Sequence, residues 1–480
     1  MSDASVRATK IVATLGPASS SADVLERMIR AGVDVMRLNF SHGTAQDHTE
    51  RAALIREVAA KVGKEVAIMA DLQGPKIRVG KIEGGRTTLD AGGKLVLDAG
   101  RTEPGTSACV GLDYKELPRD VRPGDTLLLN DGLLRLTVDA VRGEQVHTTV
   151  VVGGELSNNK GINKAGGGLT APALTAKDME DIKVAMSFQC EYLAVSFPKN
   201  ATDMEMARQL GNVAGEQSRH KPLMIAKIER SEAIPALEQI LKASDGIMVA
   251  RGDLAVEVGN AAVPALQKRM IKMAREMDRL VITATQMMES MIVNPVPTRA
   301  EVSDVANAVL DGTDAVMLSA ETAAGRFPVE TVENMAAICV EAERAEEISL
   351  DAGFTNKTFG RIDQSIAMAA LFTAYHLGCK AILALTESGS TALWMSRQKI
   401  HVPIFGLTSQ IKSQRRMAMY RNVTPFLMPP FDDRDAALQH AEKILVERGV
   451  LKPGDTYGIT CGEPMGYPGG TNMLKVVRVG

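Results

Sequence analysis

Two pairs of opposite charges follow two neighbouring apolar segments, and these four side chains are the ones best suited to chemistry. Lys227 and Glu229 end the apolar run that begins at residue 223, and Arg251 and Asp253 follow the run 246–250. Residues i and i+2 of a strand project from one face, so the Lys227 ammonium and the Glu229 carboxylate would lie side by side. Surface ion pairs at loop starts are the plainer interpretation. We favour a functional site, because Lys and Glu are rarely buried without a reason and perturbed charges cluster at working sites.

Such a site would suit a small anion and a divalent cation. Glu229 and Asp253 could hold Mg²⁺, which prefers a few carboxylates plus substrate oxygens. Arg37 and Lys227 would neutralise a phosphate or a carboxylate. His42 follows a hydroxyl residue but has no acid placed to orient it, so a nucleophilic Ser or Cys is not indicated. The residues alone support metal-assisted phosphoryl transfer or enolate chemistry, since phosphoryl transfer needs mainly positioning and charge neutralisation.

Repeated βα units are expected to position these side chains. Short apolar runs alternate with helical patterns, and the segments that predict strands are 10–15, 33–39, 65–72, 192–196, 222–227, 246–250, 280–285 and 314–318. Ser21 is expected to cap the first helix, and further helices are expected to start at Thr44 and at Thr175. Eight parallel strands are the number that closes a (β/α)8 TIM barrel, whose site lies at the carboxyl ends of the strands. A doubly wound open sheet is the alternative.

The ends of the predicted strands carry an unusual density of hydroxyl, carboxylate and guanidinium groups. The residues at these ends are Arg37, Asn39, Asp71, Ser196, Lys227, Glu229, Arg251, Asp253, Thr285, Ser319 and Glu321. Any one of them could belong to an ordinary polar loop, and Thr285 and Ser319 could simply be helix N-caps. Together they indicate one site at the carboxyl end of the barrel.

Two segments depart from the βα pattern. From 74 to 163, short alternating runs between Gly-containing turns predict an inserted all-β domain, spaced like a small β-barrel and placed to act as a lid. A separate α/β segment follows, with a helix at 362–377 and strands at 381–385, 402–407 and 474–479. The predicted domains are a catalytic barrel (1–73 and 164–345), the inserted lid domain (74–163) and a C-terminal regulatory α/β domain (346–480).

Composition excludes several classes of function. The chain has 480 residues, a 45% apolar share and a net charge of −3, so neither nucleic acid nor a membrane is expected as a partner. Its five cysteines show no CxxC spacing, which argues against a zinc site or a disulfide framework and for a reducing cytosol. We find no secretory signal pattern and no apolar run near the ~18 residues of a membrane span. The expected location is the cytoplasm.

Six motifs along nearly the whole chain resemble those of the pyruvate kinase family. They are KIVATLGPAS at 10–19, MRLNFSHG at 36–43, IAKIE at 225–229, MVARGDL at 248–254, ATQMMES at 284–290 and MLSAET at 317–322. The resemblance implies transfer of the phosphoryl group of phosphoenolpyruvate to ADP, with Mg²⁺ or Mn²⁺, followed by protonation of the enolate to pyruvate. It also implies a homotetramer.

The resemblance assigns a role to each motif residue. Glu229 and Asp253 would hold the metal, Lys227 would stabilise the phosphoryl group and the enolate, and Arg37 would bind the transferring phosphate. Amides at Gly252 and Asp253 would bind the substrate carboxylate with Thr285. The groups that could deliver the proton are Thr285, Ser319 and Glu321, among which the sequence does not choose. The residues expected on the nucleotide side are Asn39, Ser41, His42, Arg78 and Lys160.

Residue 76 departs from the usual family pattern. Many members need K⁺, held by residues that match Asn39, Ser41, Asp71 and the carbonyl of Leu72, and carry Glu where this chain has Lys76. An ammonium there could supply the charge that K⁺ otherwise brings. We therefore expect activity without K⁺.

A loop in the C-terminal segment is a candidate effector site. LTESGST at 385–391 follows a predicted strand and opens a helix, and loop amides with a helix N-terminus favour an anion. The residues expected to bind a phosphorylated effector are Thr386, Ser388, Gly389, Ser390 and Thr391. A plain βα turn is the alternative. For the whole chain, two other functions remain open here: a metal-dependent lyase or aldolase acting on pyruvate enolate, and a non-catalytic sugar-phosphate sensor.

Overall fold

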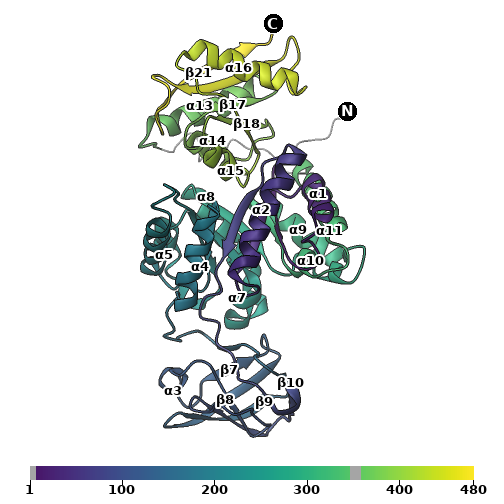
Figure 1. Cartoon of the computed structure of the whole chain (residues 1–480), viewed down its shortest axis with the longest axis vertical. Coiled ribbons are helices and arrows are strands. Elements are labelled where there is room, and N and C mark those ends of the chain that lie inside the picture. Colours follow the sequence, from purple (N-terminus) through teal and green to yellow (C-terminus); the bar gives the residue numbers. More distant parts are fainter. Residues whose placement is uncertain (1–6, 346–357) are drawn as a thin grey trace.

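The structure is a computed structural model that describes residues 7–345 and 358–480. The predicted boundary at 346 between the barrel and the C-terminal domain therefore lies outside the described residues. Figure 1 shows three bodies in a row, with the inserted β domain at one end, the barrel in the middle and the C-terminal domain at the other end. Within the described ranges, no helix has the length and apolar character needed to cross a membrane.

Eight parallel strands form a closed barrel, as predicted. In chain order they are β1 (Lys10–Thr14), β2 (Val35–Asn39), β3 (Ala67–Asp71), β12 (Tyr192–Val195), β13 (Leu223–Ile228), β14 (Gly246–Ala250), β15 (Leu280–Ala284) and β16 (Ala315–Leu318). The sheet closes because β1 pairs with both β2 and β16. A doubly wound open sheet would have two unpaired edges, so that alternative is wrong. The fold is a TIM barrel carrying an inserted domain and a C-terminal α/β domain.

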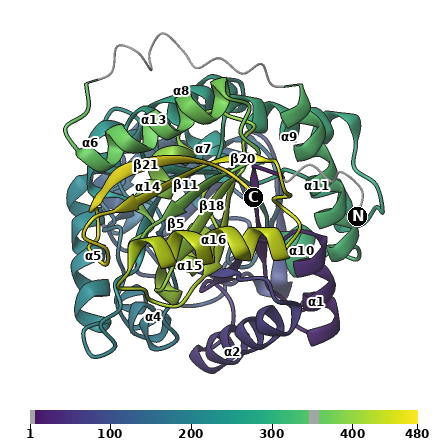
Figure 2. The same ribbon diagram turned by 90° about the horizontal axis from the view of Figure 1, so that it is seen from above.

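Helices surround the barrel, and the view along its axis shows them as an outer ring (Figure 2). They are α1 (Ala22–Ala31), α2 (Ala45–Val62), α4 (Ala176–Ser187), α5 (Ala201–Ala214), α6 (Leu237–Ala243), α7 (Arg251–Val258), α8 (Val263–Glu276), α9 (Arg299–Asp311), α10 (Ala320–Ala323) and α11 (Pro328–Arg344). Ser21, Thr44 and Thr175 cap α1, α2 and α4, and each side chain accepts a hydrogen bond from a backbone N–H of the first turn. Such a cap stabilises a helix by about 1 kcal/mol.

A carboxylate stands immediately before alternate strands at the amino end of the barrel. Asp34, Glu191, Asp245 and Asp314 precede β2, β12, β14 and β16, and we call them the amino-end carboxylates. Each accepts a hydrogen bond of 2.7–2.9 Å from a backbone N–H of the neighbouring strand. Each also pairs with its own arginine, and the four partners in the same order are Arg7, Arg56, Arg208 and Arg397. The hydrogen bonds to the backbone thus join neighbouring strands where the strands begin.

The inserted segment is mostly β-structure with a core of its own. Its strands are β4 (Arg86–Leu89), β5 (Lys94–Asp98), β6 (Cys109–Gly111), β7 (Thr126–Leu129), β8 (Leu134–Arg142), β9 (Gln145–Val152), β10 (Gly154–Ser157) and β11 (Ile162–Lys164). They form a six-stranded sheet and a two-stranded sheet rather than one closed sheet, and register shifts in the β8–β9 pair bend the larger one. A short helix, α3 (Leu117–Asp120), was not anticipated.

The C-terminal segment packs a five-stranded sheet against helices. The strands are β17 (Ile382–Leu385), β18 (Ile404–Thr408), β19 (Val423–Leu427), β20 (Thr456–Gly462) and β21 (Thr471–Arg478), and the helices are α13 (Ile362–His376), α14 (Ser390–Ser396), α15 (Ile411–Met417) and α16 (Arg434–Glu447). The sequence analysis found α13, β17, β18 and β21 and missed β19 and β20. Pro425 interrupts the strand pattern in β19, which lies at one edge of the sheet where Pro is tolerated.

Direct contacts join the C-terminal domain to the amino end of the barrel. The Lys10 ammonium donates a 2.7 Å hydrogen bond to the carbonyl of Val423, and the Asn422 amide donates to the carbonyl of Ala8. The Arg397–Asp314 pair also crosses this junction, with both side chains fully buried. The carboxyl end of the barrel therefore faces the inserted domain, away from the C-terminal domain.

Candidate active site at the carboxyl end of the barrel

Lys227 lies at the centre of a buried cluster of charges at the end of β13. Its ammonium is 3.0 Å from Glu229 Oε1 and 3.1 Å from Asp71 Oδ1, and it donates a 2.7 Å hydrogen bond to the Ser196 hydroxyl. Burial alone would lower the pKa of Lys227, but the two carboxylates raise it above its usual value. A permanently charged ammonium is thus held at the mouth of the barrel.

Arg37 adds a second cation to the same cluster. Its Nε donates to Asp71 Oδ2 at 2.6 Å, and its Nη1 donates to the Thr14 hydroxyl at 3.0 Å. Asp71 is therefore shared between Arg37 and Lys227. Burial favours the neutral acid, but the two cations hold the pKa of Asp71 below its usual range. The guanidinium of Arg37 is fixed in place and keeps donors that Asp71 does not use.

Glu229 is a buried carboxylate with more negative than positive neighbours. Its Oε2 accepts a 2.9 Å hydrogen bond from the Phe197 amide, and its Oε1 faces Lys227. Burial raises the pKa of Glu229 to about 7, and the negative charges of Asp253 and Asp71 outweigh part of the help from Lys227. The carboxyl ends of β13 and β14 thus bring two carboxylates into electrostatic contact.

This pair of carboxylates fits a hard divalent cation. Two oxygen ligands that repel each other are the donor set that Mg²⁺ accepts, with further oxygens from water or substrate. Among the described residues no cluster of three or more His, Cys, Asp or Glu side chains converges on one point. A cation here would therefore depend on ligands that the protein does not supply.

Lys76, from the inserted segment, reaches the second of these carboxylates. Its ammonium lies 3.6 Å from Asp253 Oδ1, and both side chains are about one-third exposed, at 32% and 27%. This is the one ion pair that Lys76 forms within 7–345 and 358–480. Lys76 thus connects the inserted domain to the edge of the carboxylate pair.

Thr285 follows β15 in a strained backbone conformation. Its φ of +77° is rare for a β-branched residue, and Gln286 follows at +55°. Gly252 permits this geometry, because a Cβ at residue 252 would lie 2.8 Å from the Thr285 methyl group. Arg251 holds the turn by donating to the Thr285 carbonyl at 2.7 Å, and it pairs with Asp304 at 2.7 Å. These contacts fix the position of Thr285 relative to the first turn of α7.

Ser319 and Glu321 form a third group after β16. Glu321 Oε2 accepts a 2.7 Å hydrogen bond from the Ser319 amide, and Oε1 accepts one of 3.2 Å from the Met288 amide. Burial raises the pKa of Glu321. The Ser319 hydroxyl makes no capping bond to α10. Glu321 therefore ties the end of β16 to the loop that carries Thr285.

The residues expected on the nucleotide side lie in two places. Asn39 Oδ1 accepts a 3.1 Å hydrogen bond from the Ser41 amide, and the exposed His42 follows in the same turn. Arg78 is in the inserted segment, pairs in a β-bridge with Gly161 and donates to the carbonyl of Asn159. Lys160 is half-buried beside that bridge. Within the described residues, no hydrogen bond or ion pair joins Arg78 or Lys160 to the barrel cluster.

The oxygens expected to bind K⁺ are already engaged. Asp71 is paired with two cations, the Leu72 carbonyl accepts a 2.8 Å hydrogen bond from the Ser196 hydroxyl, and Asn39 Oδ1 accepts from Ser41.

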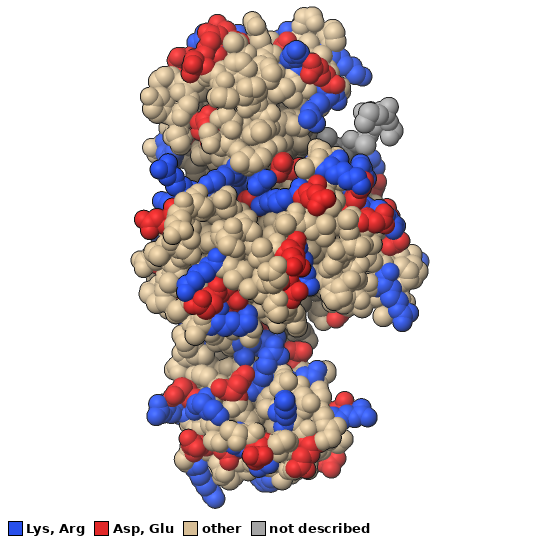
Figure 3. Space-filling view, in the orientation of Figure 1, with Lys and Arg blue, Asp and Glu red and all other residues tan. Residues whose placement is uncertain are grey.

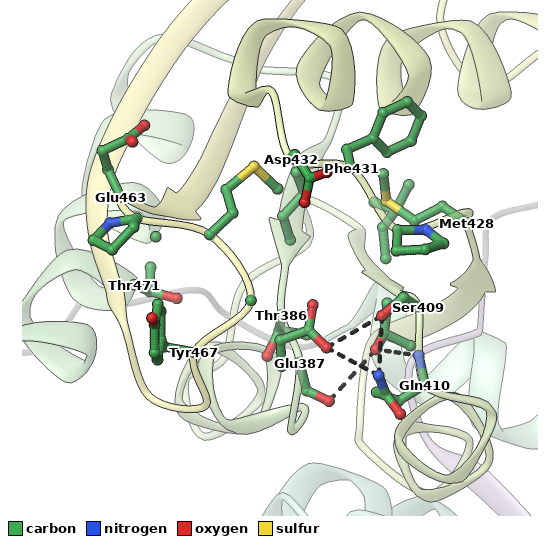
Figure 4. Close-up of a pocket in the computed structure, with 18 of the residues that line it drawn as sticks. Thr386, Glu387, Ser409, Gln410, Met428, Phe431, Asp432, Glu463, Tyr467 and Thr471 are labelled. Atoms are coloured by element: carbon green, nitrogen blue, oxygen red, sulfur yellow. Dashed lines mark hydrogen bonds between the residues drawn. The ribbon is translucent and has the colours of Figure 1, made fainter.

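The loop expected to bind an effector forms a compact βα turn between β17 and α14. Gly389 donates to the Thr386 hydroxyl at 3.0 Å, the Ser388 and Ser390 hydroxyls lie 3.1 Å apart, and Thr391 contacts the Thr471 hydroxyl at 2.7 Å. Figure 4 shows Thr386 and Glu387 at the floor of a pocket that Ser409, Phe431, Asp432, Glu463 and Tyr467 also line.

Sequence reasoning undervalued two residues of the site. Ser196 was expected only as one of several polar residues at strand ends, with no role of its own, yet its hydroxyl contacts the Lys227 ammonium directly. Arg251 was recognised only as a charge after β14, yet its guanidinium donates hydrogen bonds to the Thr285 carbonyl and stabilises the strained turn. The position of Ser196 at a strand end was the available signal. The charge of Arg251 was visible in the sequence, but its partners were not, because they depend on how the loops after β14 and β15 approach each other.

A closed parallel barrel with buried cations and paired carboxylates at its carboxyl end is typical of an enzyme that acts on small anions. Comparison with known proteins is more specific. Residues 6–332 match the family model "Pyruvate kinase, barrel domain" and residues 364–477 match "Pyruvate kinase, alpha/beta domain". Pyruvate kinase II of Salmonella typhimurium is 50% identical over 480 residues, covering 99% of each chain. A pyruvate kinase of Haemophilus influenzae is 50% identical over 462 residues, covering 95% of this chain and 96% of its own.

The chain therefore belongs to the pyruvate kinase family, and it is a phosphotransferase. This membership decides against the barrel lyase or aldolase and against the non-catalytic sensor. The family is generally Mg²⁺-dependent, which agrees with the pair of carboxylates at Glu229 and Asp253.

Proposed function

We propose that the barrel transfers the phosphoryl group of phosphoenolpyruvate to ADP and then protonates the enolate to give pyruvate and ATP. The observation that carries this proposal is the buried cluster in which Lys227 lies 3.0 Å from Glu229 and 3.1 Å from Asp71, with Arg37 on the other side of Asp71. Two fixed cations beside two carboxylates suit a reaction in which charge moves between phosphate oxygens and an enolate.

The cations and the carboxylates of the cluster would have different roles in the reaction. Glu229 and Asp253 would hold Mg²⁺ or Mn²⁺, which when bound would neutralise phosphate charge. Lys227 would stabilise the phosphoryl group in transfer and the enolate oxygen left behind. Arg37 would bind the phosphate with the donors that Asp71 leaves free. These groups are held by one another before substrate arrives, so little reorganisation is needed during the reaction.

The first turn of α7 would bind the substrate carboxylate. The amides of Gly252 and Asp253 lie at its N-terminus, where the helix dipole favours an anion, and the Thr285 side chain lies against Gly252 through its methyl group. Thr285, Ser319 and Glu321 are the groups that could pass a proton to the enolate through water. Burial raises the pKa of Glu321, which favours the protonated acid and suits this residue to supply a proton.

The nucleotide would lie between the barrel and the inserted domain. Asn39, Ser41 and His42 would line its barrel side, and Arg78 and Lys160 would reach it from the inserted domain. This domain, residues 74–163, would act as a lid. Lid closure would exclude water, which could otherwise accept the phosphoryl group.

Activity should not require K⁺. Asp71 already has two cations, and the Leu72 carbonyl and Asn39 have hydrogen-bond donors, so these oxygens have little need of a further ion. Lys76 adds positive charge at Asp253 rather than at Asp71. Its contribution would therefore be to the edge of the metal-binding pair.

We further propose that the protein is a cytoplasmic homotetramer whose activity is regulated by a phosphorylated effector. The loop residues Thr386, Ser388, Gly389, Ser390 and Thr391 would respond to a phosphorylated effector. Exposed apolar side chains lie on α13 (Ile362 and Phe372), directly after it (Leu377), and after η4 (Glu289–Ile292) at Val293 and Val296. Two separate apolar faces per subunit suit a tetramer with two kinds of interface. Light scattering would test the assembly.

The decisive experiment is pyruvate formation from phosphoenolpyruvate and ADP with Mg²⁺, run with and without K⁺ and with Lys227→Met as control. We expect turnover in both buffers and its loss in the variant. Turnover that needs K⁺ would reject the K⁺ argument and keep the enzyme. Equal turnover in Lys227→Met would reject the assigned role of Lys227, and no turnover in either buffer would reject the proposed reaction.

A further inference from the structure

The two connections between the inserted domain and the barrel meet at the start of α4. Figure 3 shows that the molecule narrows where the inserted domain joins the barrel. The chain enters this domain at Gly74 and returns to the barrel through Thr175, the residue that caps α4. The side chain of Asp178, in the first turn of α4, accepts hydrogen bonds from both residues, although Gly74 lies 104 residues before it. Asp178 therefore joins the entry of the inserted domain to its exit.

The carboxylate of Asp178 is fully buried and is held by hydrogen bonds. Its Oδ2 accepts from the Thr175 amide at 2.8 Å and from the Thr175 hydroxyl at 2.7 Å, and its Oδ1 accepts from the Gly74 amide at 3.0 Å. The residue is 0% exposed, and it forms no ion pair within residues 7–345 and 358–480. A buried carboxylate is costly unless such donors compensate its charge, so these bonds are needed to keep it in place.

A helix cap alone does not explain this arrangement. Helix α2 begins with the same motif, in which the Asp47 carboxylate accepts from the Thr44 amide at 2.7 Å and from the Thr44 hydroxyl at 2.8 Å. In the described part of the chain, the Asp47 side chain has no hydrogen-bond partner besides Thr44. The bond to Gly74 is what Asp178 adds to the motif, and it reaches out of α4 to the inserted domain.

Gly74 lies directly against the residues that hold the Lys227 cluster. Its φ is +66°, and a Cβ at residue 74 would lie 2.7 Å from Ser196 Cβ and 3.0 Å from the Phe197 ring. The Ser196 hydroxyl accepts a 2.7 Å hydrogen bond from Lys227, and the Phe197 amide donates at 2.9 Å to Glu229. A shift of Gly74 would therefore displace the groups that contact Lys227 and Glu229.

The returning segment is attached to the barrel before it reaches α4. Arg230 donates to the Leu169 carbonyl at 3.2 Å, and Lys199 donates to the Ala171 carbonyl at 3.1 Å. Directly before this attached part, the glycines at 166–168 all have positive φ, between +78° and +91°. Because glycine adopts such angles without strain, the bend of this connection falls at the glycines and not nearer to α4.

From these contacts we infer that Asp178 is a positioning residue for phosphoryl transfer. It fixes both connections of the inserted domain at one point, so the domain closes about a fixed pivot while Ser196 and Phe197 stay in place. Asp178 acts through Gly74, because none of its hydrogen bonds within the described residues reaches the Lys227 cluster. The inference rests on the proposed reaction and on closure of the lid.

The test compares Asp178→Asn with the matched control Asp47→Asn, each in the full chain. An asparagine at residue 178 keeps one oxygen for the two Thr175 donors and presents its NH₂ group to the Gly74 amide, which loses its acceptor. In the pyruvate assay, kcat per folded molecule of Asp178→Asn should fall about tenfold or more, because a misplacement of about 1 Å is costly in catalysis. The control should keep kcat within about twofold. A purely structural cap would change urea unfolding in both variants and kcat in neither.

Hydrogen–deuterium exchange measures the connection without turnover. Peptides that contain Gly74 should exchange about tenfold or more faster in Asp178→Asn than in the unmodified chain, and at the same rate in Asp47→Asn. Unchanged exchange or unchanged kcat in Asp178→Asn would overturn the inference.

Gly74→Ala provides a second variant, because its Cβ displaces Ser196 and leaves the cap of α4 intact. We expect a loss of kcat at least as large as that of Asp178→Asn, and kcat within about twofold of the unmodified chain would also overturn the inference. If the unmodified chain formed no pyruvate, the proposed reaction would be rejected, whereas the exchange rates would still decide whether Asp178 fixes the connection. The two failures are therefore distinguishable.

Discussion

The two ends of the barrel both contain buried charges, but the charges are arranged differently. At the amino end, each of the amino-end carboxylates has its own arginine and its own backbone donor. At the carboxyl end, Asp71 is shared by Arg37 and Lys227, Lys227 is shared by Asp71 and Glu229, and Glu229 faces Asp253. The first arrangement is complete without a ligand. The second leaves charge that a substrate and a cation can use.

This difference shows how to distinguish a structural ion pair from a functional one. Asp34 and Asp71 are both fully buried acids whose pKa lies below its usual range despite burial, because cations surround them. Burial and a shifted pKa therefore do not identify the site. What distinguishes it is Glu229, because burial raises the pKa of this acid to about 7 and the nearby carboxylates of Asp253 and Asp71 add to the rise. Removal of a charge should cost stability at one end and activity at the other.

The largest effect is expected from Lys227→Met at the carboxyl end. Loss of the ammonium removes stabilisation of both the phosphoryl group and the enolate, so kcat should fall by about 10³-fold. Lys64→Met is the matched control, because Lys64 pairs with Asp34 at 3.1 Å at the amino end. The control should lower thermal stability and keep kcat within about twofold of the unmodified chain. Similar losses of kcat in the two variants would remove the distinction between the ends.

Asp314→Asn should give the largest loss of stability. The side chains of Asp314 and Arg397 are both 0% exposed, so the substitution leaves a buried guanidinium without its counter-charge. Breaking a buried pair from one side costs about 3 kcal/mol or more. Urea unfolding would measure it, and kcat per folded molecule should be unchanged. A loss below about 1 kcal/mol would show that the pair does not hold the C-terminal domain to the barrel.

Lys10 predicts a pH dependence at the amino end. Burial lowers the pKa of Lys10 from 10.5 to about 8. Between these values the unfolded chain holds a proton that the folded chain has released, so this residue makes stability rise with pH through that window. The full contribution is at most about 3 kcal/mol. Unfolding at about pH 7 and about pH 9.5 should show a smaller rise for Lys10→Met than for the unmodified chain; identical pH profiles would contradict the assignment.

Much of the carboxyl end could be predicted from the sequence, and little of the amino end could. The charged residues at or near the carboxyl ends of β2, β3, β13 and β14 adjoin apolar runs, so their place at one end of a parallel barrel follows from the strand count. Asp34 and Asp314 also adjoin strands, but a carboxylate before a strand looks like an ordinary loop residue. The partner of Asp314 is 83 residues away in another domain. No local sequence pattern predicts such a pair.

Within the site, residue types could be predicted more readily than conformations. The position of Thr285 at a strand end was clear, but its positive φ depends on the absence of a Cβ at Gly252 and on the carbonyl contact from Arg251. Strand β20 was missed for a similar reason. It is buried between β17 and β21, but its Gly and Thr residues interrupt the apolar pattern by which a buried strand is recognised. Tertiary contacts determine such features, and these contacts cannot be predicted from the local pattern of a single sequence.

The smallest effect on stability, and the sharpest test of the boundary between the two classes of ion pair, is expected from Lys76→Met. The Lys76–Asp253 pair is 3.6 Å long and about one-third exposed, so it should contribute less than about 0.5 kcal/mol to folding. Its role would instead be electrostatic, because Asp253 belongs to the pair proposed to hold Mg²⁺. We expect unchanged unfolding by urea but weaker activity in K⁺-free buffer that added K⁺ restores, with Lys81→Met as a control for charge in the inserted domain. A variant as active without K⁺ as the unmodified chain would show that Lys76 is a surface charge, and that the engagement of Asp71 by Arg37 and Lys227 accounts for K⁺ independence by itself.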